Sequence, residues 1–160
     1  MNIRKMGIVF YWATTLTLPF ARTTAQINTQ VNLDEAKKAI TASNQTYLQA
    51  FAKNDVSLFI NCYAQDCWIM PPGAPALCGP DAPGDFFKTA YNKLGIRNGK
   101  LITIDVYGIG EDVVAEIGFF KLYTVDDVEL DDGKFLVLWK RTPDGWKRWR
   151  DLFNSSRSNH

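Results

Sequence analysis

The sequence predicts an α+β domain in which helices come first and a curved antiparallel sheet follows. Helical segments, with apolar residues at three- and four-residue spacing, occupy the first part of the chain. Four apolar, strand-like segments separated by glycine-containing turns occupy the second part. Short turns join antiparallel neighbours, so these four strands should form a meander.

The first predicted helix runs from Asn32 to Lys53. Asn32 and Glu35 have the spacing of a capping box, which satisfies backbone N–H groups at a helix start. One face carries residues that recur every three or four positions: Ala36, Ile40, Ser43, Tyr47, Ala50 and Phe51. This periodicity predicts a helix that buries one side.

Two shorter helices should follow the first. Asp55 can cap a helix over Val56–Tyr63, and Asp81 can cap one that ends at Leu94. Two short extended segments between them could pair through a proline-rich turn: Cys67–Met70 and Ala76–Cys78.

The four later strands are defined by apolar runs and by the turns between them. The predicted strands are Leu101–Tyr107, Val113–Tyr123, Phe135–Arg141 and Trp146–Phe153. The predicted turns are Gly108-Ile109-Gly110, Asp131-Asp132-Gly133 and Pro143-Asp144-Gly145.

The composition excludes several classes of function. Lys and Arg total 18 and Asp and Glu total 17, so the net charge of +1 gives no general attraction to nucleic acid or anionic membranes. The single histidine is His160, the last residue. Histidine-based catalytic triads and zinc sites are therefore not expected, and acid–base chemistry would need carboxylates, Tyr, Lys or Cys. We expect neither a metal nor a cofactor.

The first 25 residues have the layout of a signal peptide. Arg4 and Lys5 precede the uncharged segment Met6–Leu18, and the small residues Thr23-Thr24-Ala25 precede Gln26. We expect residues 1–25 to be removed and 26–160 to form one exported domain, periplasmic or secreted, with no stable membrane anchor. The apolar run is shorter than the ~20 residues that span a bilayer, and a retained anchor is the alternative.

Export would place Cys62, Cys67 and Cys78 in an oxidising compartment. Three cysteines allow at most one internal disulfide, and Cys67 could pair with either of the other two. The alternative is three buried thiols that pack as small apolar side chains.

Four short motifs occur in order along the chain: Asn54-Asp55 with Tyr63-Ala64-Gln65-Asp66, Pro71-Pro72-Gly73 through Gly79, Ala115-Glu116-Ile117-Gly118, and Gly145-Trp146-Lys147 with Arg150-Asp151-Leu152-Phe153-Asn154. With these motifs the chain resembles the nuclear-transport-factor-two-like superfamily. Within it, the chain is similar to the domain-of-unknown-function 4440 family, near the SnoaL-like polyketide cyclases, over about residues 33–154. Pro83-Gly84 departs from the family pattern, which usually has an apolar residue there.

The resemblance implies a cone: a curved sheet wrapped around a long N-terminal helix, the cystatin-like α+β barrel. Such cones commonly hold a small, often apolar ligand and dimerise through the outer sheet face. The candidate ligand-binding residues here are Tyr47, Phe51, Met70, Phe87, Glu116 and Asp151.

Ketosteroid isomerase shares this fold and uses an Asp base with a Tyr and a protonated Asp. Tyr47, eight residues before Asp55, matches its tyrosine. The position of its base falls on Pro71, which cannot accept a proton, and the strand of its second Asp matches Lys134–Leu138, which has no carboxylate. Steroid-type isomerisation is therefore not expected, and Tyr47 can equally be a core tyrosine.

Glu116 and Asp151 are the carboxylates that could act in a cone. Glu116 lies in an apolar strand, so it is either paired on the outer face or buried inside, where desolvation would make it a usable acid or base. Arg150 and Asp151 are consecutive and should face opposite sides of the sheet. We expect Glu116 to be structural, with a nearby Lys, Arg or Tyr as partner.

Three surface patterns have simpler explanations than a binding site. The basic and aromatic residues of Lys140–Arg150 fit a solvated hairpin, so no nucleic-acid partner is expected. The acidic residues of 126–132 lack the glycine position of a calcium loop. Asn44-Gln45-Thr46 and Asn154-Ser155-Ser156 fit the N-glycosylation pattern, which matters only in a eukaryotic host.

The sequence thus predicts an exported domain that binds a small, largely apolar molecule. The alternatives are an isomerase, dehydratase or cyclase that uses Tyr47 with Glu116 or Asp151, and a non-catalytic dimerisation module. Every residue of Phe135–Trp139 is apolar, so both faces of that strand should be covered. The helices can cover one face, and a second subunit could cover the other, which predicts a homodimer through the sheet.

Overall fold

The computed structural model describes residues 20–108 and 112–157, and these form helices packed against one six-stranded sheet. The order of elements along the chain is α1 (Phe20–Lys53), α2 (Val56–Ile60), β1 (Tyr63–Met70), β2 (Leu77–Cys78), α3 (Ala82–Asn92), β3 (Asn98–Tyr107), β4 (Val113–Tyr123), β5 (Glu129–Thr142) and β6 (Gly145–Ser155). The α+β fold class predicted from the sequence is confirmed.

The sheet has the strand order β2-β1-β6-β5-β4-β3. Strands β3 to β6 form the predicted antiparallel meander, and β2 pairs back on β1. The pairing of β1 with β6 is parallel, so the expectation of a wholly antiparallel sheet was wrong for this pair. The reason is a crossover: after β2 the chain passes through α3 to β3 at the far edge and returns strand by strand to β6. Turn motifs report only local pairings and carry no sign of this distant one.

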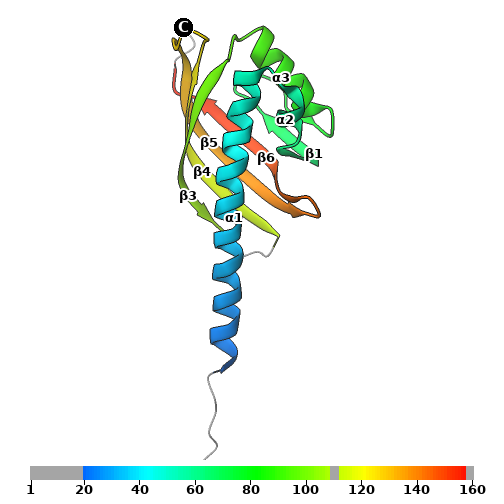
Figure 1. Cartoon of the computed structure of the whole chain (residues 1–160), viewed down its shortest axis with the longest axis vertical. Helices are drawn as coiled ribbons and strands as arrows, with labels where there is room; N and C mark the ends of the chain where they lie inside the picture. The colour runs from blue at the N-terminus through cyan, green and yellow to red at the C-terminus, as the bar shows by residue number, and fades with distance from the viewer. Residues whose placement is uncertain (1–19, 109–111, 158–160) are drawn as a thin grey trace, which may run out of the picture.

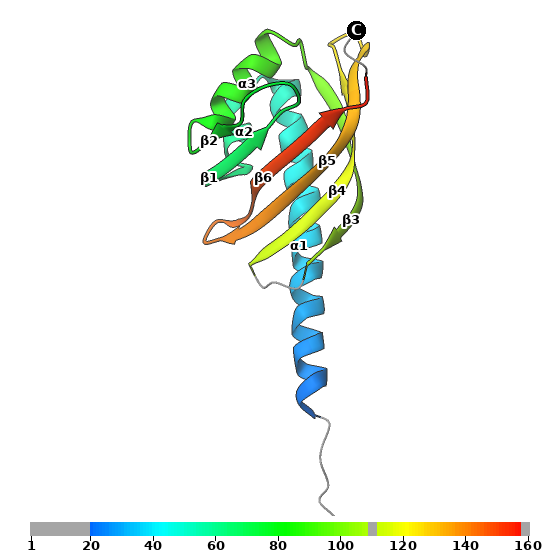
Figure 2. The same cartoon turned by 180° about the vertical axis from the view of Figure 1, so that it is seen from behind.

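Helix α1 crosses the concave side of the curved sheet (Figure 1), and Figure 2 shows the sheet wrapping it from behind. Helices α2 and α3 cover the sheet beside β1. Buried apolar residues form two clusters. One, between α1, α2, α3 and β1, is centred on Phe51, Phe59 and Phe87, and the other, between α1 and the meander, on Ile40, Val137 and Trp139. The cone implied by the resemblance is present.

Helix α1 begins at Phe20, twelve residues before the predicted start at Asn32. The capping box is therefore not used as a start, because the backbone of Asn32 already lies inside the helix. Extending an existing helix avoids the cost of nucleating a new one, and no proline interrupts 20–32. Residues 1–19 of the predicted signal peptide lie outside the described residues, and its predicted boundary falls within α1. Among the described helices, none combines the length and apolarity that a membrane span requires.

The other helix caps and ends follow the sequence closely. The Asp55 carboxylate accepts hydrogen bonds from the backbone N–H groups of Ser57 and Leu58, as predicted, at 3.0 and 3.4 Å. The predicted cap at Asp81 was wrong: this residue takes the N-cap position of α3, but its backbone is already helical, Pro83 in the first turn has no N–H group, and its side chain makes no capping hydrogen bond. Helix α2 ends at Ile60, three residues earlier than predicted, and α3 ends at Asn92, two residues earlier than predicted.

The turn predicted at Asp131-Asp132-Gly133 was wrong, because these residues lie inside β5. The chain turns instead over residues 124–128, where the N–H group of Thr124 bonds the carbonyl of Val128. Gly133 is needed for packing: a Cβ atom there would lie 2.7 Å from the Phe120 ring. The glycine thus lets the neighbouring strands and the aromatic side chain approach closely.

All three cysteines are free thiols. Cys62 and Cys67 are buried, whereas Cys78 is exposed, so the expectation of three buried thiols holds for two of them. Cys78 lies opposite Trp68 in the β1–β2 ladder, and the Trp68 side chain points away from the core. Cys67, the residue before Trp68, points into the core. Burial raises the pKa of Cys67 to about 11, which keeps this thiol protonated and unreactive.

Candidate functional site

A β-bulge at Trp149 brings two charged side chains of β6 to the same face. Trp139 pairs with Arg148 and the preceding Leu138 pairs with Arg150, so Trp149 is an extra residue. Arg148 and Asp151 are three apart and would face opposite sides of a regular strand. Beyond the bulge they both point inward, with side chains only 3% and 5% exposed.

Arg148 is the centre of a buried polar network. Its Nη1 atom donates to Oδ2 of Asp151 at 3.2 Å, and its Nη2 atom donates to Oδ1 of Asn44 on α1. The guanidinium carbon lies 4.6 Å from the centre of the Tyr47 ring and 4.9 Å from that of the Trp139 ring. The aromatic faces stabilise the cation while excluding water from it.

Glu116 forms the other end of this network, on β4. Its Oε1 atom accepts hydrogen bonds from Nδ2 of Asn44 at 2.7 Å and from the Thr103 hydroxyl at 2.6 Å, and its Oε2 atom accepts one from the Trp139 indole at 3.0 Å. The side chain is completely buried. Its hydrogen-bond partners are thus neutral donors, not the Lys, Arg or Tyr expected from the sequence, and Asn44 links it to Arg148.

The tyrosines beside Asp151 remain protonated. The Tyr63 hydroxyl donates to Oδ2 of Asp151 at 2.7 Å. Burial, and then the negative charge of Asp151, raise the pKa of both Tyr47 and Tyr63. Burial lowers the pKa of Arg148, but the charge of Asp151 and its neighbours outweighs this and raises it overall, so the guanidinium stays charged.

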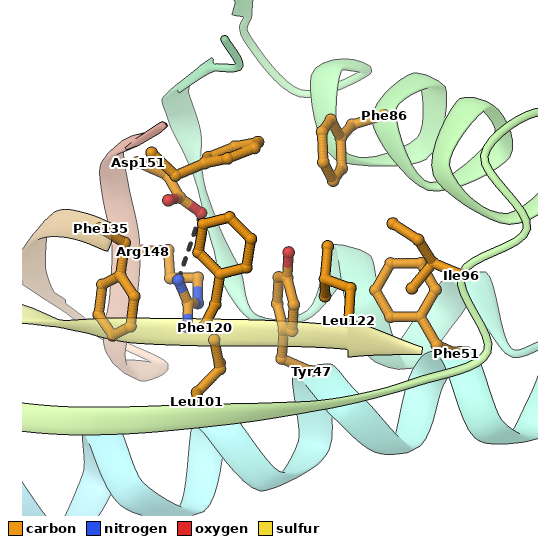
Figure 3. Close-up of a pocket in the computed structure, with 11 residues that line it drawn as sticks. Tyr47, Phe51, Phe86, Ile96, Leu101, Phe120, Leu122, Phe135, Arg148 and Asp151 are labelled. Atoms are coloured by element: carbon orange, nitrogen blue, oxygen red, sulfur yellow. Dashed lines mark hydrogen bonds and ion pairs between the residues drawn. The ribbon is translucent and has the colours of Figure 1, made fainter. Parts of the chain in front are cut away.

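A pocket opens beside the network, between α1, α3 and the concave face of the sheet (Figure 3). Its volume is about 470 Å³, including the open mouth. The polar lining residues are Tyr47, Arg148 and Asp151, and the apolar ones are Phe51, Phe86, Ile96, Leu101, Phe120, Leu122, Phe135 and Phe153. Arg148 and Asp151 lie together on one side, and the Tyr47 hydroxyl points from α1 into the cavity.

The Glu-x-Gly motif of β4 supports both the network and the pocket. Glu116 is held in the network, and Gly118, two residues on, lies under the Phe135 ring. A Cβ atom at Gly118 would be 2.8 Å from Cε1 of Phe135. The glycine therefore lets this ring, which lines the pocket, approach the backbone of β4 closely.

Three of the six predicted ligand-binding residues line the pocket: Tyr47, Phe51 and Asp151. Met70 does not, because it follows the inward-facing Ile69 and pairs with Leu152 on the outer side of the sheet. The other two predicted residues lie behind the pocket wall. Phe87 stacks on Phe51 inside the helical core, with ring centres 4.9 Å apart, and Glu116 is enclosed by the network.

Sequence reasoning missed Arg148, Asn44 and Tyr63. The signal for Arg148 was present: Trp146 and Phe153 are both apolar but seven residues apart, an odd spacing that a regular strand cannot place on one face. The Asn44 glycosylation pattern was misleading, since this side chain is buried in the network. Tyr63 had no signal, because its parallel pairing was not foreseen.

Three polar atoms at or near the network have no hydrogen-bond partner among the residues that the structure describes. Among the described residues, nothing bonds the buried Nε atom of Arg148 or the Trp146 indole nitrogen. Within the same part of the chain, no donor reaches Oδ1 of Asp151, although Oδ2 accepts two hydrogen bonds. No group of metal-ligating side chains occurs in residues 20–108 and 112–157. The site is suited to hydrogen bonding of an organic molecule.

A structural role for Glu116 predicts a large loss of stability when it is removed. Glu116→Leu leaves the buried donors of Asn44 and Trp139 unpaired and the Arg148 charge less balanced, so the free energy of unfolding should fall by about 3–5 kcal/mol. Glu129→Leu is the matched control, because Glu129 is partly exposed and bonds Lys121 and Arg157 at the surface. It should cost at most about 1 kcal/mol. Urea denaturation measures both, and equal small losses would contradict the structural role.

Comparisons with known proteins identify the fold. No family model matches the sequence, and no curated protein matches it. Among solved structures, a nuclear-transport-factor-two-like protein of unknown function from Shewanella oneidensis superimposes with a TM-score of 0.63 at 16% identity, covering 74% of this chain and 98% of that one. A ketosteroid isomerase-like protein from Erwinia carotovora atroseptica gives 0.62 at 21% identity, over 74% and 95%.

A hexachlorocyclohexane dehydrochlorinase, LinA-type3 from Novosphingobium barchaimii, gives a TM-score of 0.63 at 13% identity, over 80% of this chain and 91% of that one. All three likenesses span most of both chains, at identities that report on the fold alone. The chain therefore has the nuclear-transport-factor-two-like, or cystatin-like, fold that its sequence motifs resemble.

Proposed function

We propose that this protein is an exported domain that binds a small, largely apolar molecule in the pocket. The observation that carries the proposal is the lining of the cavity: eight apolar side chains surround a group of three polar ones. Ligand sites typically combine an apolar wall with a few placed polar groups that fix orientation. The signal-peptide layout of residues 1–25 supports export.

An isomerase, dehydratase or cyclase of SnoaL-like type is the second candidate. It is favoured by the position of the Asp151 carboxylate in the pocket beside the protonated Tyr47 and Tyr63. Against it, Oδ2 of Asp151 is held by Arg148 and Tyr63, and Pro71 occupies the position that matches an isomerase base. Binding without turnover agrees best with a carboxylate fixed in this way.

The binding proposal predicts that the exported protein captures a small molecule. Protein recovered from an export-competent host should begin at or near Gln26, and mass spectrometry of its organic extract should show a co-purifying apolar compound. Leu101→Trp places a larger ring in the pocket and should abolish capture. Leu94→Trp is the control, since Leu94 is exposed and lies away from the pocket lining. Capture that survives Leu101→Trp would place the ligand elsewhere.

We also propose a homodimer through the outer face of the sheet. Along β5, Phe135, Val137 and Trp139 point inward, whereas Leu136 is 37% exposed on the other side. It joins further exposed apolar side chains of neighbouring strands: Ile102, Phe119 and Leu152. Register places Ile102 opposite Phe119 and Leu136 opposite Leu152, and Ile117, two residues from Phe119 on the same face of β4, lies opposite Leu136 and links the two pairs. Apolar patches of this kind mark interaction sites, and a pure dimerisation module would use this face alone.

The dimer proposal predicts the mass that light scattering measures at micromolar concentration. The unmodified protein should give twice the chain mass, and Leu136→Lys should give the chain mass because it places a charge in the middle of the apolar surface. Leu94→Lys, at an exposed position on the α3–β3 connection, should leave the dimer intact. A monomeric unmodified protein would rule the proposal out.

A further inference from the structure

The polar side of the pocket offers an acceptor in place of a donor. Oδ2 of Asp151 is occupied by Tyr63 and Arg148, whereas no described residue donates to Oδ1. An ionised carboxylate oxygen can accept about two hydrogen bonds. The Asp151 side chain lines the pocket with only 5% of it exposed, and Oδ1 is not among the fully enclosed atoms, so it is a poorly hydrated acceptor that a ligand could satisfy.

The neighbouring cation is poorly placed to bind an anion. Nη1 and Nη2 of Arg148 each donate one hydrogen bond, to Asp151 and Asn44, its Nε atom is enclosed, and only 3% of the side chain is exposed. The Tyr47 and Trp139 rings lie against its guanidinium group. A carboxylate entering the pocket would therefore find no free, accessible guanidinium fork of the kind that binds carboxylates elsewhere.

The charges of the network also disfavour an anionic ligand. Its formal charges are one guanidinium, on Arg148, and two carboxylates, on Glu116 and Asp151. A ligand carboxylate would bring a third negative charge into a water-poor site, where like charges repel strongly. A hydroxyl or ammonium group would instead meet the free Oδ1 atom.

We propose that the ligand of this pocket carries a hydrogen-bond donor, a hydroxyl or an ammonium group, that binds Oδ1 of Asp151, and that carboxylate-bearing molecules are excluded. The inference rests on the proposed binding function and specifies the chemistry of its ligand. The apolar wall, which includes the rings of Phe51, Phe120 and Phe135, then holds the hydrocarbon part of the same molecule.

The test uses probes that share one two-ring body and differ in a single substituent. Dissociation constants are measured by fluorescence for naphthalene, 2-methoxynaphthalene, 2-naphthol, 2-naphthylmethylamine and 2-naphthoate. A donor that meets a desolvated carboxylate should bind about tenfold or more tightly than the same body without a donor. We expect 2-naphthol or the amine to exceed 2-methoxynaphthalene by this factor, and 2-naphthoate to bind more weakly than naphthalene.

Asp151→Asn should remove most of the advantage of the donor-bearing probe and relieve the exclusion of 2-naphthoate. Asp85→Asn is the control, since Asp85 is a surface carboxylate paired with Lys88, and it should change neither. Because the five probes are compared on the unmodified protein, the proposal stays testable even if Asp151→Asn does not fold. Equal binding of 2-naphthol and 2-methoxynaphthalene, or tightest binding of 2-naphthoate, overturns this inference alone. Binding of none of the five overturns the proposed function with it.

Discussion

The buried ion pair between Arg148 and Asp151 is the interaction on which the rest of the site depends. It exists because Trp149 is bulged out of β6, which turns two side chains three residues apart to one face. The bulge is held from the outside as well: the Trp149 indole donates to Asp66 at 3.0 Å, and the Arg150 guanidinium carbon lies 4.0 Å from the centre of its ring. One extra residue thereby decides which charges the cone contains.

Charges buried in this way must be satisfied, and their partners fix the geometry of the cone. The network draws one or more side chains from α1, β1, β3, β4 and β5 onto β6, through Asn44, Tyr63, Thr103, Glu116 and Trp139. Hydrogen bonds are directional, whereas apolar packing tolerates small shifts. The network therefore sets how α1 sits against the sheet, between the two apolar clusters, and so how wide the pocket is.

The same constraint explains why the pocket has an unusual polar side. The guanidinium of Arg148 bonds Asp151 and Asn44 and is only 3% exposed, so little of it is accessible to a ligand. Among the described residues, the accessible atom of the ion pair that has no hydrogen-bond partner is then a carboxylate oxygen, Oδ1 of Asp151, because the Nε atom of Arg148 is enclosed. The side chains that stabilise the fold through buried hydrogen bonds are therefore also the ones that present polar atoms to the pocket.

Much of the fold could be predicted from local patterns, since they report local structure. The 3.6-residue periodicity placed the buried face of α1, Asp55 was identified as a cap, and the four strands of the meander were placed to within a few residues except at β5. Predictions failed where a distant contact decided the outcome. The parallel β1–β6 pair depends on a crossover, and Gly133 serves the packing of Phe120 in place of a turn.

The site was harder to predict than the fold, for one physical reason. Assigning faces on β6 assumed regular alternation, which correctly separated Arg150 from Asp151 but left Arg148 unnoticed across the bulge. Tyr47 and Phe51, which line the pocket, lie on the face of α1 that helix periodicity predicts to be buried, whereas the alternation of β6 left open which of Arg150 and Asp151 points inward. Asn44 and Glu116 are 72 residues apart in the sequence and meet through a side-chain hydrogen bond, and no local sequence pattern predicts such a contact.

The central claim is that Arg148 and Asp151 act as one unit, and a double-mutant cycle tests it most directly. Arg148→Met, Asp151→Asn and the double variant are compared by the free energy of unfolding in urea. Each single change strands a buried partner and should cost about 3–5 kcal/mol. The double variant should cost clearly less than the sum of the two, by about 1–3 kcal/mol, as contacting residues do. Costs that simply add would show that the two residues act independently and would contradict this account of the site.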